Sequence, residues 1–165
     1  MRMSTLCLLA LVGLAAPGCG PTGMSGPSMN SRMNPASASP VVSTDILGRE
    51  PRANETKVKH ILIGWGDLAG AYPGGMDPRA QARSKRDAEG EIRGLRKQLD
   101  GGAVFEALMK AHSEDRGSAA SGEAYTVEPG ASLVIEFRQL GLRLEVGELG
   151  VVESQFGFHL MKRIE

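Results

Sequence analysis

The sequence predicts an α+β fold in which a small, mostly antiparallel, four-stranded sheet is surrounded by helices. First, runs of β-branched and apolar residues at 57–65 and 125–127, and on both sides of Ser154–Phe156, are typical of strands. Second, three segments between them carry apolar residues at helical spacing. Third, the order strand, helix, helix, strand, helix, strand, strand favours an α+β arrangement.

The first half of the domain is predicted to contain one strand and one long helix. The segment KVKHILIGW, residues 57–65, has the apolar and β-branched character of a strand and is followed by a glycine. A helix is expected to begin at Asp77 and Pro78, which suit the N-cap and the first helical position. It should continue to about Leu99, where two glycines end it. Its apolar face consists of Ala88, Ile92, Leu95 and Leu99.

The second half is predicted to contain two helices and three strands. A small-residue loop, EDRGSAASGEAYTV, leads into the short strand at 125–127, and a hairpin closes the chain. The helix in AVFEALMKAHS is expected to bury Val104, Phe105, Leu108 and Met109, with His112 as a further candidate. The helix in ASLVIEFRQLGLRL is expected to direct Leu133, Phe137 and Leu140 inward.

The last strand carries a histidine between bulky apolar neighbours, in the stretch FGFHLMKRI. Period-two alternation places His159 and Met161 on one face of the strand and Phe158 and Leu160 on the other. Gly157 indicates a bend or a close approach of two backbone segments. A single histidine in a strand is more often a hydrogen-bonded core residue than a functional one, so its role is open at this point.

The first 18 residues predict a signal peptide. Arg2 gives a positive start, and the apolar run Leu6–Ala16 is too short to span a bilayer. A buried core helix is disfavoured, because a low-complexity stretch follows directly. The stretch LAAPGC resembles a bacterial lipoprotein signal, which implies lipidation of Cys19; ordinary cleavage after a small residue is the alternative. Gly20 after the cysteine, where Asp would signal retention, favours an exported protein anchored in the outer membrane and facing the periplasm.

Residues 19–56 are predicted to be a disordered tether, and residues 57–165 the folded domain. The tether is rich in Gly, Pro, Ser and Asn and contains few large apolar residues. Its composition suits a spacer that holds a domain away from a membrane. The short stretch VVSTDIL within it is compatible with either a transient strand or a weak docking segment.

Composition excludes several classes of function. The 19 basic and 19 acidic side chains balance, so the chain has no long-range field for a polyanion and we expect no nucleic-acid partner. Both cysteines, Cys7 and Cys19, lie in the predicted signal segment or directly after it. The folded part therefore has neither a disulfide framework nor a thiolate metal site, and we expect no metal and no cofactor.

Three stretches together resemble the parvulin family of peptidyl-prolyl cis/trans isomerases. KHILI is similar to the family's first strand. HSEDRGSAASGE is similar to a loop that usually reads Ser-x-Asp-Pro-Gly-Ser-Ala-x-x-Gly-Gly, and VGELGVVESQFGFHLMKRIE is similar to the carboxyl-terminal hairpin. The resemblance covers residues 57–165 and implies the parvulin fold and isomerisation of X–Pro bonds.

The resemblance also implies a set of site residues. His60 and His159 correspond to the pair of active-site histidines, and Asp115 to the family's Asp or Cys position. Arg116 departs from the pattern, because proline is usual there, and residues 123–125 replace the usual Gly-Asp-Leu-Gly. The implied pocket for the proline ring consists of Leu133, Phe137 and Phe156, with Ala124 or Tyr125 at the irregular segment.

Plainer interpretations of the same residues exist. Asp115 could cap a turn, and Leu133 and Phe137, four positions apart, fit ordinary core packing. A zinc site formed by the three histidines is conceivable, but no ligand spacing supports it.

The implied chemistry needs neither a metal nor a covalent step. Resonance gives the X–Pro bond a barrier of about 18–20 kcal/mol, and an apolar pocket can lower it by holding the proline ring and desolvating the imide. The loop before the first long helix carries Asp67 and Asp77, whereas phosphate-selective parvulins have a basic cluster there, so no phosphorylated substrate is expected.

We expect a monomer that acts on proline-containing unfolded or extended polypeptides and assists the folding of exported proteins. One alternative is a parvulin-like chaperone or binding module with weak or no isomerase activity. Another is a structural lipoprotein whose pocket has decayed.

Overall fold

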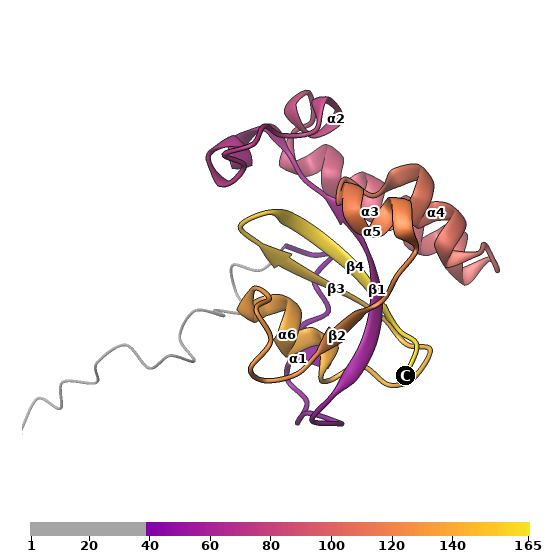
Figure 1. Cartoon of the computed structure of the whole chain (residues 1–165). Helices are drawn as coiled ribbons and strands as arrows, with labels where there is room; N and C mark the ends of the chain where they lie inside the picture. Colours follow the sequence, from indigo (N-terminus) through magenta and orange to yellow (C-terminus); the bar gives the residue numbers. More distant parts are fainter. Residues whose placement is uncertain (1–38) are drawn as a thin grey trace, which may run out of the picture. The chain divides into compact units, whose positions relative to one another are not determined.

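The computed structural model describes residues 39–165. The predicted signal peptide and Cys19 lie outside these residues. Four antiparallel strands form one sheet in the order β2-β1-β4-β3, so the α+β prediction is confirmed (Figure 1). The strands are β1 (Thr56–Ile63), β2 (Tyr125–Val127), β3 (Leu149–Ser154) and β4 (Gly157–Arg163).

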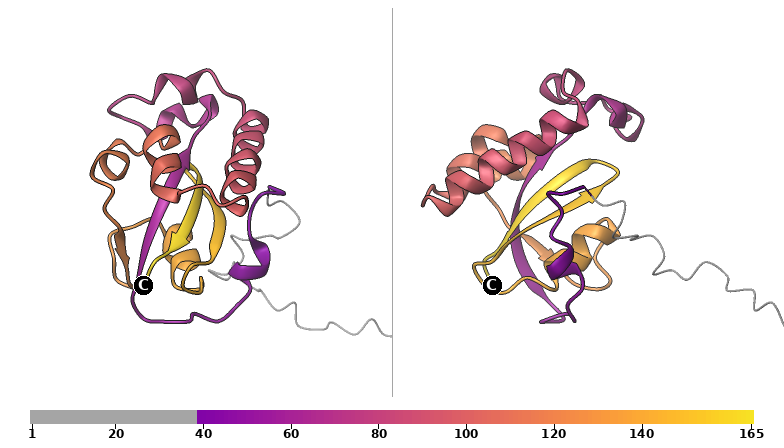
Figure 2. Two further views of the ribbon diagram at one scale, coloured as in Figure 1. Left: turned by 90° about the vertical axis from the view of Figure 1, so that its right-hand side faces the viewer. Right: turned by 180° about the vertical axis from the view of Figure 1, so that it is seen from behind.

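Helices cover both faces of the sheet. The longest, α3, packs with α4 on one face, and α6 lies with the short α1 on the other, as the two further views in Figure 2 also show. The helices are α1 (Thr44–Leu47), η2 (Gly66–Ala71, a 3-10 helix), α2 (Pro78–Gln81), α3 (Lys85–Asp100), α4 (Phe105–His112), α5 (Arg116–Ser121) and α6 (Ile135–Gly141). Among the helices of residues 39–165, none is both long and apolar enough to cross a membrane.

Alternation along the two central strands separates two apolar clusters. Phe158 and Leu160 join the cluster beneath α3 and α4, whereas Met161 joins the cluster beneath α6. Successive side chains of a strand point to opposite faces, so His159 lies on the α6 side, as its place in the sequence predicts. Gly157 has a φ of 134°, and a Cβ there would run into the carbonyl oxygen of Ile63. A close backbone approach therefore requires this glycine.

The structure corrects the helix predicted from Asp77 to Leu99, which is two helices. Asp77 caps α2 as expected, but α2 is only four residues long. Ser84 then begins α3 with a capping box, accepting a hydrogen bond from the Asp87 backbone N–H while the Asp87 side chain accepts one from the Ser84 backbone. Such a box specifies a new helix start, so the chain turns between the two helices.

Two further expectations for the second half are wrong. Val104, expected to be buried, is 62% exposed, because it occupies the N-cap position of α4 and precedes the apolar face. The loop expected before 125–127 contains α5, which Asp115 caps by accepting a hydrogen bond from the backbone N–H of Gly117. Gly122, with a φ of 72°, ends that helix in the left-handed region.

The folded part begins before residue 57, unlike the boundary expected from composition. Ile46 in α1 is 3% exposed and packs in the cluster beneath α6. Ser43 exchanges two hydrogen bonds with Val151 of β3, at 2.9 and 3.0 Å, and Arg49 bonds to Glu148 at 2.9 Å. The stretch VVSTDIL is therefore a docking segment along the outer edge of β3, not part of a tether.

Candidate active site

Two histidines lie side by side on the central strands of the sheet. His60 is in β1 and His159 is in β4, and the register pairs Leu62 with His159 and His60 with Met161. The Nδ1 atoms of the histidines are 3.2 Å apart, their rings stack with centroids 5.3 Å apart, and each residue is only 4% exposed. The sheet thus brings together two residues that are 99 positions apart in the sequence.

Asp115 extends the histidine pair toward the surface. Its Oδ2 lies 2.9 Å from Nε2 of His60 and accepts hydrogen bonds from the hydroxyls of Ser118, at 2.9 Å, and Tyr125, at 2.7 Å. The position of Asp115 at the start of α5 directs its carboxylate to His60. These hydrogen bonds, that from His60 first, hold the pKa of Asp115 well below its usual range, so the carboxylate is ionised near neutral pH.

The far end of the network is Ser154, the last residue of β3. Its Oγ lies 2.7 Å from Nε2 of His159 and accepts a hydrogen bond from the backbone N–H of Phe156. An ionised Asp115 requires a proton on Nε2 of His60. With His60 neutral, its Nδ1 accepts from Nδ1–H of His159, whose Nε2 then accepts from the Ser154 hydroxyl. In that tautomer of His60, donation runs in one direction, from Ser154 to Asp115.

Burial keeps the inner histidine neutral. Desolvation first, and the proximity of His60 second, lower the pKa of His159 to about 3. At the outer end, burial and the hydrogen bond to Asp115 raise the pKa of Tyr125 to about 12, so its hydroxyl stays a donor. Near neutral pH Asp115 thus carries a negative charge, whereas His159 and Tyr125 carry none.

Aromatic side chains close the network on the α6 side. Phe137, 3% exposed, packs edge-on to His60 and His159 with ring centroids 5.1 and 5.4 Å away. The Tyr125 ring lies 5.2 Å from that of His60 and 5.7 Å from that of Phe137, also edge-on. Phe137 therefore supports the histidines directly, and Tyr125 belongs to the network as well as to the irregular segment at 123–125.

The other residues expected in the proline pocket, Leu133, Ala124 and Phe156, differ in their surroundings. Leu133 is partly buried and packs on the apolar cluster that contains Phe137. Ala124 is half-buried, directly before β2. Phe156 lies in the tight turn between β3 and β4, and its ring centroid is 5.5 Å from that of Tyr72. Its backbone N–H donates to Oγ of Ser154, which in turn bonds to His159.

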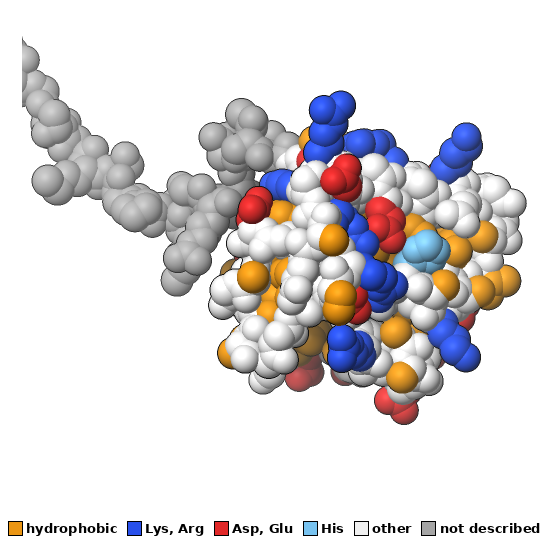
Figure 3. Space-filling view, turned by 90° about the horizontal axis from the view of Figure 1, so that it is seen from above, with side chains coloured by type: hydrophobic (Ala, Val, Ile, Leu, Met, Phe, Trp, Pro, Cys, Tyr) orange, Lys and Arg blue, Asp and Glu red, His pale blue; other side chains and the backbone are white. Residues whose placement is uncertain are grey.

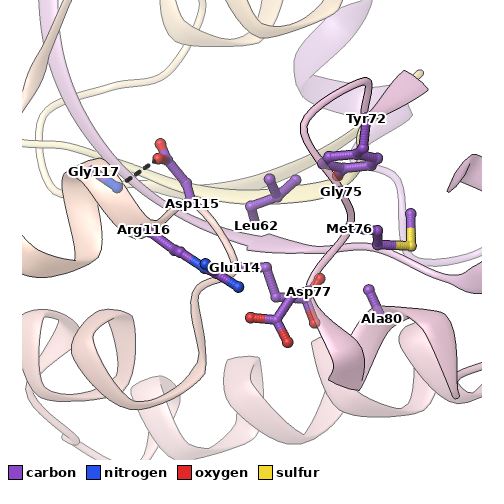
Figure 4. A pocket seen from close by; sticks show the side chains of 10 residues that line it. All are labelled: Leu62, Tyr72, Gly75, Met76, Asp77, Ala80, Glu114, Asp115, Arg116 and Gly117. Carbon is purple, nitrogen blue, oxygen red and sulfur yellow. Dashed lines mark hydrogen bonds between the residues drawn. The ribbon is translucent and has the colours of Figure 1, made fainter. Parts of the chain in front are cut away.

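A cavity of about 390 Å³ adjoins the network at Asp115. Figure 4 shows Asp115 and Arg116 on one side of it and Tyr72 and Met76 on the other, with Leu62 between them. Of the residues proposed from the sequence, only Asp115 lines it. The full lining is Leu62, Tyr72, Gly75, Met76, Asp77, Ala80, Glu114, Asp115, Arg116 and Gly117.

The sequence interpretation missed several residues of this region. Ser118 and Ser154 lie inside the two motifs that carry the resemblance, three positions after Asp115 and five before His159, so a hydrogen-bonding role could have been inferred. Tyr72 comes from a long loop without a local signal, and its hydroxyl donates to the carbonyl oxygen of Phe156. Burial and nearby carboxylates, Glu114 first, raise its pKa to about 12.

The third histidine belongs to another cluster. Nδ1 of His112 lies 3.2 Å from Oε1 of Glu91, which also bonds to Arg83 through its other oxygen at 2.8 Å.

On the face seen in Figure 3, lysine and arginine side chains are spread out, with acidic and apolar side chains between them. This distribution agrees with the balanced charge of the sequence.

Comparison with known protein families gives a match over most of the chain. Residues 44–165 match the family model described as the PPIC-type PPIase domain. A protein named chaperone SurA from Nitrosospira multiformis is 34% identical over 113 residues, which are 68% of this chain and 22% of that protein. Chaperone SurA from Cupriavidus pinatubonensis is 34% identical over 137 residues, 82% of this chain and 22% of that protein. The chain thus spans about a fifth of the length of these relatives.

Solved structures show the same fold. The peptidyl-prolyl isomerase ESS1 from Candida albicans superposes with a TM-score of 0.56 at 19% identity, over 76% of this chain and 67% of that chain. A PpiC-type peptidyl-prolyl cis-trans isomerase domain superposes with a TM-score of 0.52 at 21% identity, over 67% of this chain and 89% of that chain. At these identities the structural likeness supports the fold.

Proposed function

Because the chain belongs to the PPIC-type, or parvulin, family of peptidyl-prolyl cis/trans isomerases, we propose that it isomerises X–Pro bonds in exported polypeptides. The observation that carries the proposal is the continuous network Ser154–His159–His60–Asp115, buried against Phe137 and reaching the surface at Asp115. In this proposal the network holds the negatively charged Asp115 carboxylate beside apolar side chains, where a proline peptide would bind.

The proposed mechanism is non-covalent. Isomerisation requires rotation about a bond with a barrier of about 18–20 kcal/mol, which falls when the imide loses conjugation. The hydroxyls of Ser118 and Ser154 both take part in hydrogen bonds within the network. We propose that Leu133, Phe137 and Tyr125 hold the proline ring and desolvate the imide, while the Asp115 carboxylate acts electrostatically on the twisting bond.

The histidines act mainly by fixing Asp115 in this proposal. His159 is neutral near pH 7 and holds His60 through Nδ1, and His60 donates to the carboxylate from Nε2. A preorganised charge stabilises a transition state more effectively than a mobile one, because it need not reorient during the reaction.

We further propose that substrates need no phosphorylation. The cavity beside Asp115 is lined by the carboxylates of Asp77, Glu114 and Asp115, and by one cationic side chain, Arg116. A phosphoryl group carries about two negative charges near neutral pH. Glu114 and Asp77 are paired with Arg83 and Arg79, so we propose that repulsion from the Asp115 carboxylate disfavours a phosphorylated residue next to proline.

The proposed location rests on the sequence before the described residues. The lipoprotein-like signal and Cys19 support export and lipid anchoring, and the segment from Cys19 to residue 38 would act as a tether. We propose a monomer at the outer membrane, where unfolded or extended polypeptides with proline residues arrive after export.

A chaperone function with little catalysis is the second candidate. It is favoured by the relatives named chaperone SurA, of which this chain spans about a fifth. The irregular segment at 123–125 also places Tyr125 where the usual family sequence has a glycine-containing stretch, which changes the wall of the pocket.

An exchange measurement distinguishes the two candidates. NMR exchange spectroscopy on an unphosphorylated Ala-X-Pro peptide, with and without the protein, should show exchange well above the spontaneous rate, which is on the order of once per 10–100 s. A phosphoserine-Pro peptide should be accelerated less. If no peptide is accelerated and an unfolded client aggregates less in the presence of the protein, the chaperone candidate replaces the isomerase.

A further inference from the structure

A buried ion pair lies beside the candidate active site but outside the histidine network. Nη1 of Arg83 lies 2.6 Å from Oε1 of Glu114, and the two side chains are only 11% and 2% exposed. Removing two charges from water has a high energetic cost, so a buried pair is weak evidence of added stability. Its place in the structure therefore calls for another explanation.

Both partners hold the end of β1 at Gly64. The backbone N–H of Gly64 donates to Oε2 of Glu114 at 2.5 Å, and its carbonyl oxygen accepts from Nη1 of Arg83 at 2.8 Å. A Cβ at Gly64 would lie 3.2 Å from Oε2 of Glu114 and 3.3 Å from the carbonyl oxygen of Phe156. The pair thus fixes the backbone where β1 meets the turn between β3 and β4.

Residues 113–114 set the position of Asp115 along β1. The backbone N–H of Glu114 donates to the carbonyl oxygen of Leu62 at 2.9 Å, and that of Leu62 donates to Oγ of Ser113 at 3.1 Å. Asp115 is the next residue, and His60 lies two positions before Leu62 on the same strand. The alignment of residues 113–114 with β1 therefore brings the Asp115 carboxylate to His60.

Arg83 connects this alignment to the opposite wall of the cavity. That wall comes from the segment between β1 and α3 and includes Tyr72, Met76, Asp77 and Ala80. Arg83 lies at the end of the segment, its carbonyl oxygen accepts from the backbone N–H of Gly66 at 3.0 Å, and its Nη2 bonds to Glu91 of α3 at 2.8 Å. Arg83 therefore joins both walls of the cavity and α3, because its backbone ends one wall segment and its guanidinium bonds to Glu114 in the other wall and to Glu91.

We propose that Arg83 and Glu114 are positioning residues for the isomerase. The pair fixes the separation of the two cavity walls and the alignment of Asp115 against His60, and it acts on turnover through Asp115 without touching the peptide. This inference rests on the proposed isomerase function, and its test includes a readout that does not depend on activity.

Two conservative variants test the proposal in the full-length protein. Glu114→Gln keeps the size of the side chain and an acceptor for Gly64 N–H but removes the charge. Arg83→Lys keeps the charge but loses the planar fork that joins three partners. The matched control is Glu106→Gln, which removes an ion pair of 2.9 Å with Lys59, on the opposite face of β1 from the histidines.

For an unphosphorylated Ala-X-Pro peptide, kcat/KM should fall about 10- to 100-fold in both variants, as expected for a displaced catalytic geometry. The control should stay within about two-fold of wild type, the range expected for loss of an exposed ion pair. Circular dichroism at the assay temperature establishes that each variant is folded.

Histidine ring NMR separates positioning from a purely structural role. Glu114→Gln and Arg83→Lys should shift the Nε2 and Nδ1 resonances of His60 at a temperature where the proteins are fully folded, and Glu106→Gln should not. Lower thermal stability with unchanged ring resonances and unchanged kcat/KM of the folded protein would overturn the proposal.

Two further outcomes are also decisive. If Glu114→Gln does not fold, Arg83→Lys alone decides by the same two readouts. If the wild-type protein accelerates no peptide, the isomerase function fails, and the ring resonances still report whether the pair positions Asp115.

Discussion

At the scale of single residues, burial decides which group in the network carries charge. His159 is enclosed by the sheet and Phe137, so its ring stays neutral beside His60. Asp115 is partly exposed and receives hydrogen bonds from three side chains, so it stays ionised. The histidines and the carboxylate form one unit, in which the negative charge of Asp115 is held in place before a peptide arrives.

Replacing Asp115 tests the importance of that charge. Asp115→Asn keeps the size of the side chain and its ability to cap α5, but removes the negative charge beside the proline pocket. We expect kcat/KM for an Ala-X-Pro peptide to fall about 100-fold, comparable with the loss of one preorganised electrostatic group. Asp67→Asn, an exposed change in η2, should leave it unaltered. Equal activity of the two variants in folded protein would exclude an electrostatic role for Asp115.

The lowered pKa of His159 predicts a dependence of stability on pH. In the unfolded chain the imidazole takes up a proton near pH 6.5, whereas in the folded protein its pKa is about 3. Between these values the unfolded state binds more protons, so the free energy of unfolding falls as the pH is lowered, by up to about 1.4 kcal/mol per unit. Urea titrations at several pH values from 7 to 4.5 measure this slope.

The control for this slope is His159→Asn, which cannot titrate. Its slope should be smaller over the same range by the contribution of one histidine. Asp115 is present in both proteins, so the loss of stability that its lowered pKa causes from about pH 5 downward contributes to both slopes. Identical slopes in the two proteins would show that His159 is not held neutral.

At the scale of elements, the sequence predicted what repeats locally and missed what depends on distant contacts. The four strands, α4 and α6 follow from alternation and helical spacing, and the resemblance named His60, Asp115 and His159 before any geometry. The sequence also contains a signal for the division between α2 and α3, because Ser84 and Asp87 form a capping box. The prediction of one continuous helix overlooked this signal.

Other features had no local signal. Residues 39–47 have the composition of a linker, and their docking depends on hydrogen bonds between Ser43 and Val151, 108 positions away. The cavity wall containing Tyr72 comes from a loop that ends near Arg83, which pairs with Glu114, 31 positions away. Long-range contacts of this kind leave no periodicity in the segments that make them.

The docking of α1 can be tested by truncating its one buried side chain. Ile46→Ala removes an apolar group that is 3% exposed and packs in the cluster of Leu140 and Leu144. We expect the free energy of unfolding to fall by about 2–4 kcal/mol, the usual cost of a large-to-alanine change in a core. Asp45→Ala, the exposed neighbour in α1, should cost less than about 0.5 kcal/mol. Equal stability of both variants would place the start of the folded part near residue 57 after all.

At the scale of the whole molecule, the site depends on the complete sheet. His60 comes from β1, His159 from β4, Ser154 from β3, Tyr125 from β2 and Asp115 from the start of α5. Every strand therefore contributes one residue to the network. Activity should therefore respond to the integrity of the whole sheet, and the location of the protein needs a separate test.

Location is therefore tested by changing one cysteine outside the described residues. If Cys19 is acylated, each buried methylene contributes about 0.8 kcal/mol, so several chains hold the protein firmly on a membrane. Cys19→Ser should move the protein from the membrane fraction to the soluble fraction and abolish incorporation of labelled palmitate. Cys7→Ser is the matched control within the signal segment and should leave both unchanged. Isomerase activity of the purified Cys19→Ser protein should equal that of wild type, because the residues of the proposed site all lie within residues 39–165. Membrane association that survives Cys19→Ser would favour ordinary cleavage and attachment by another route.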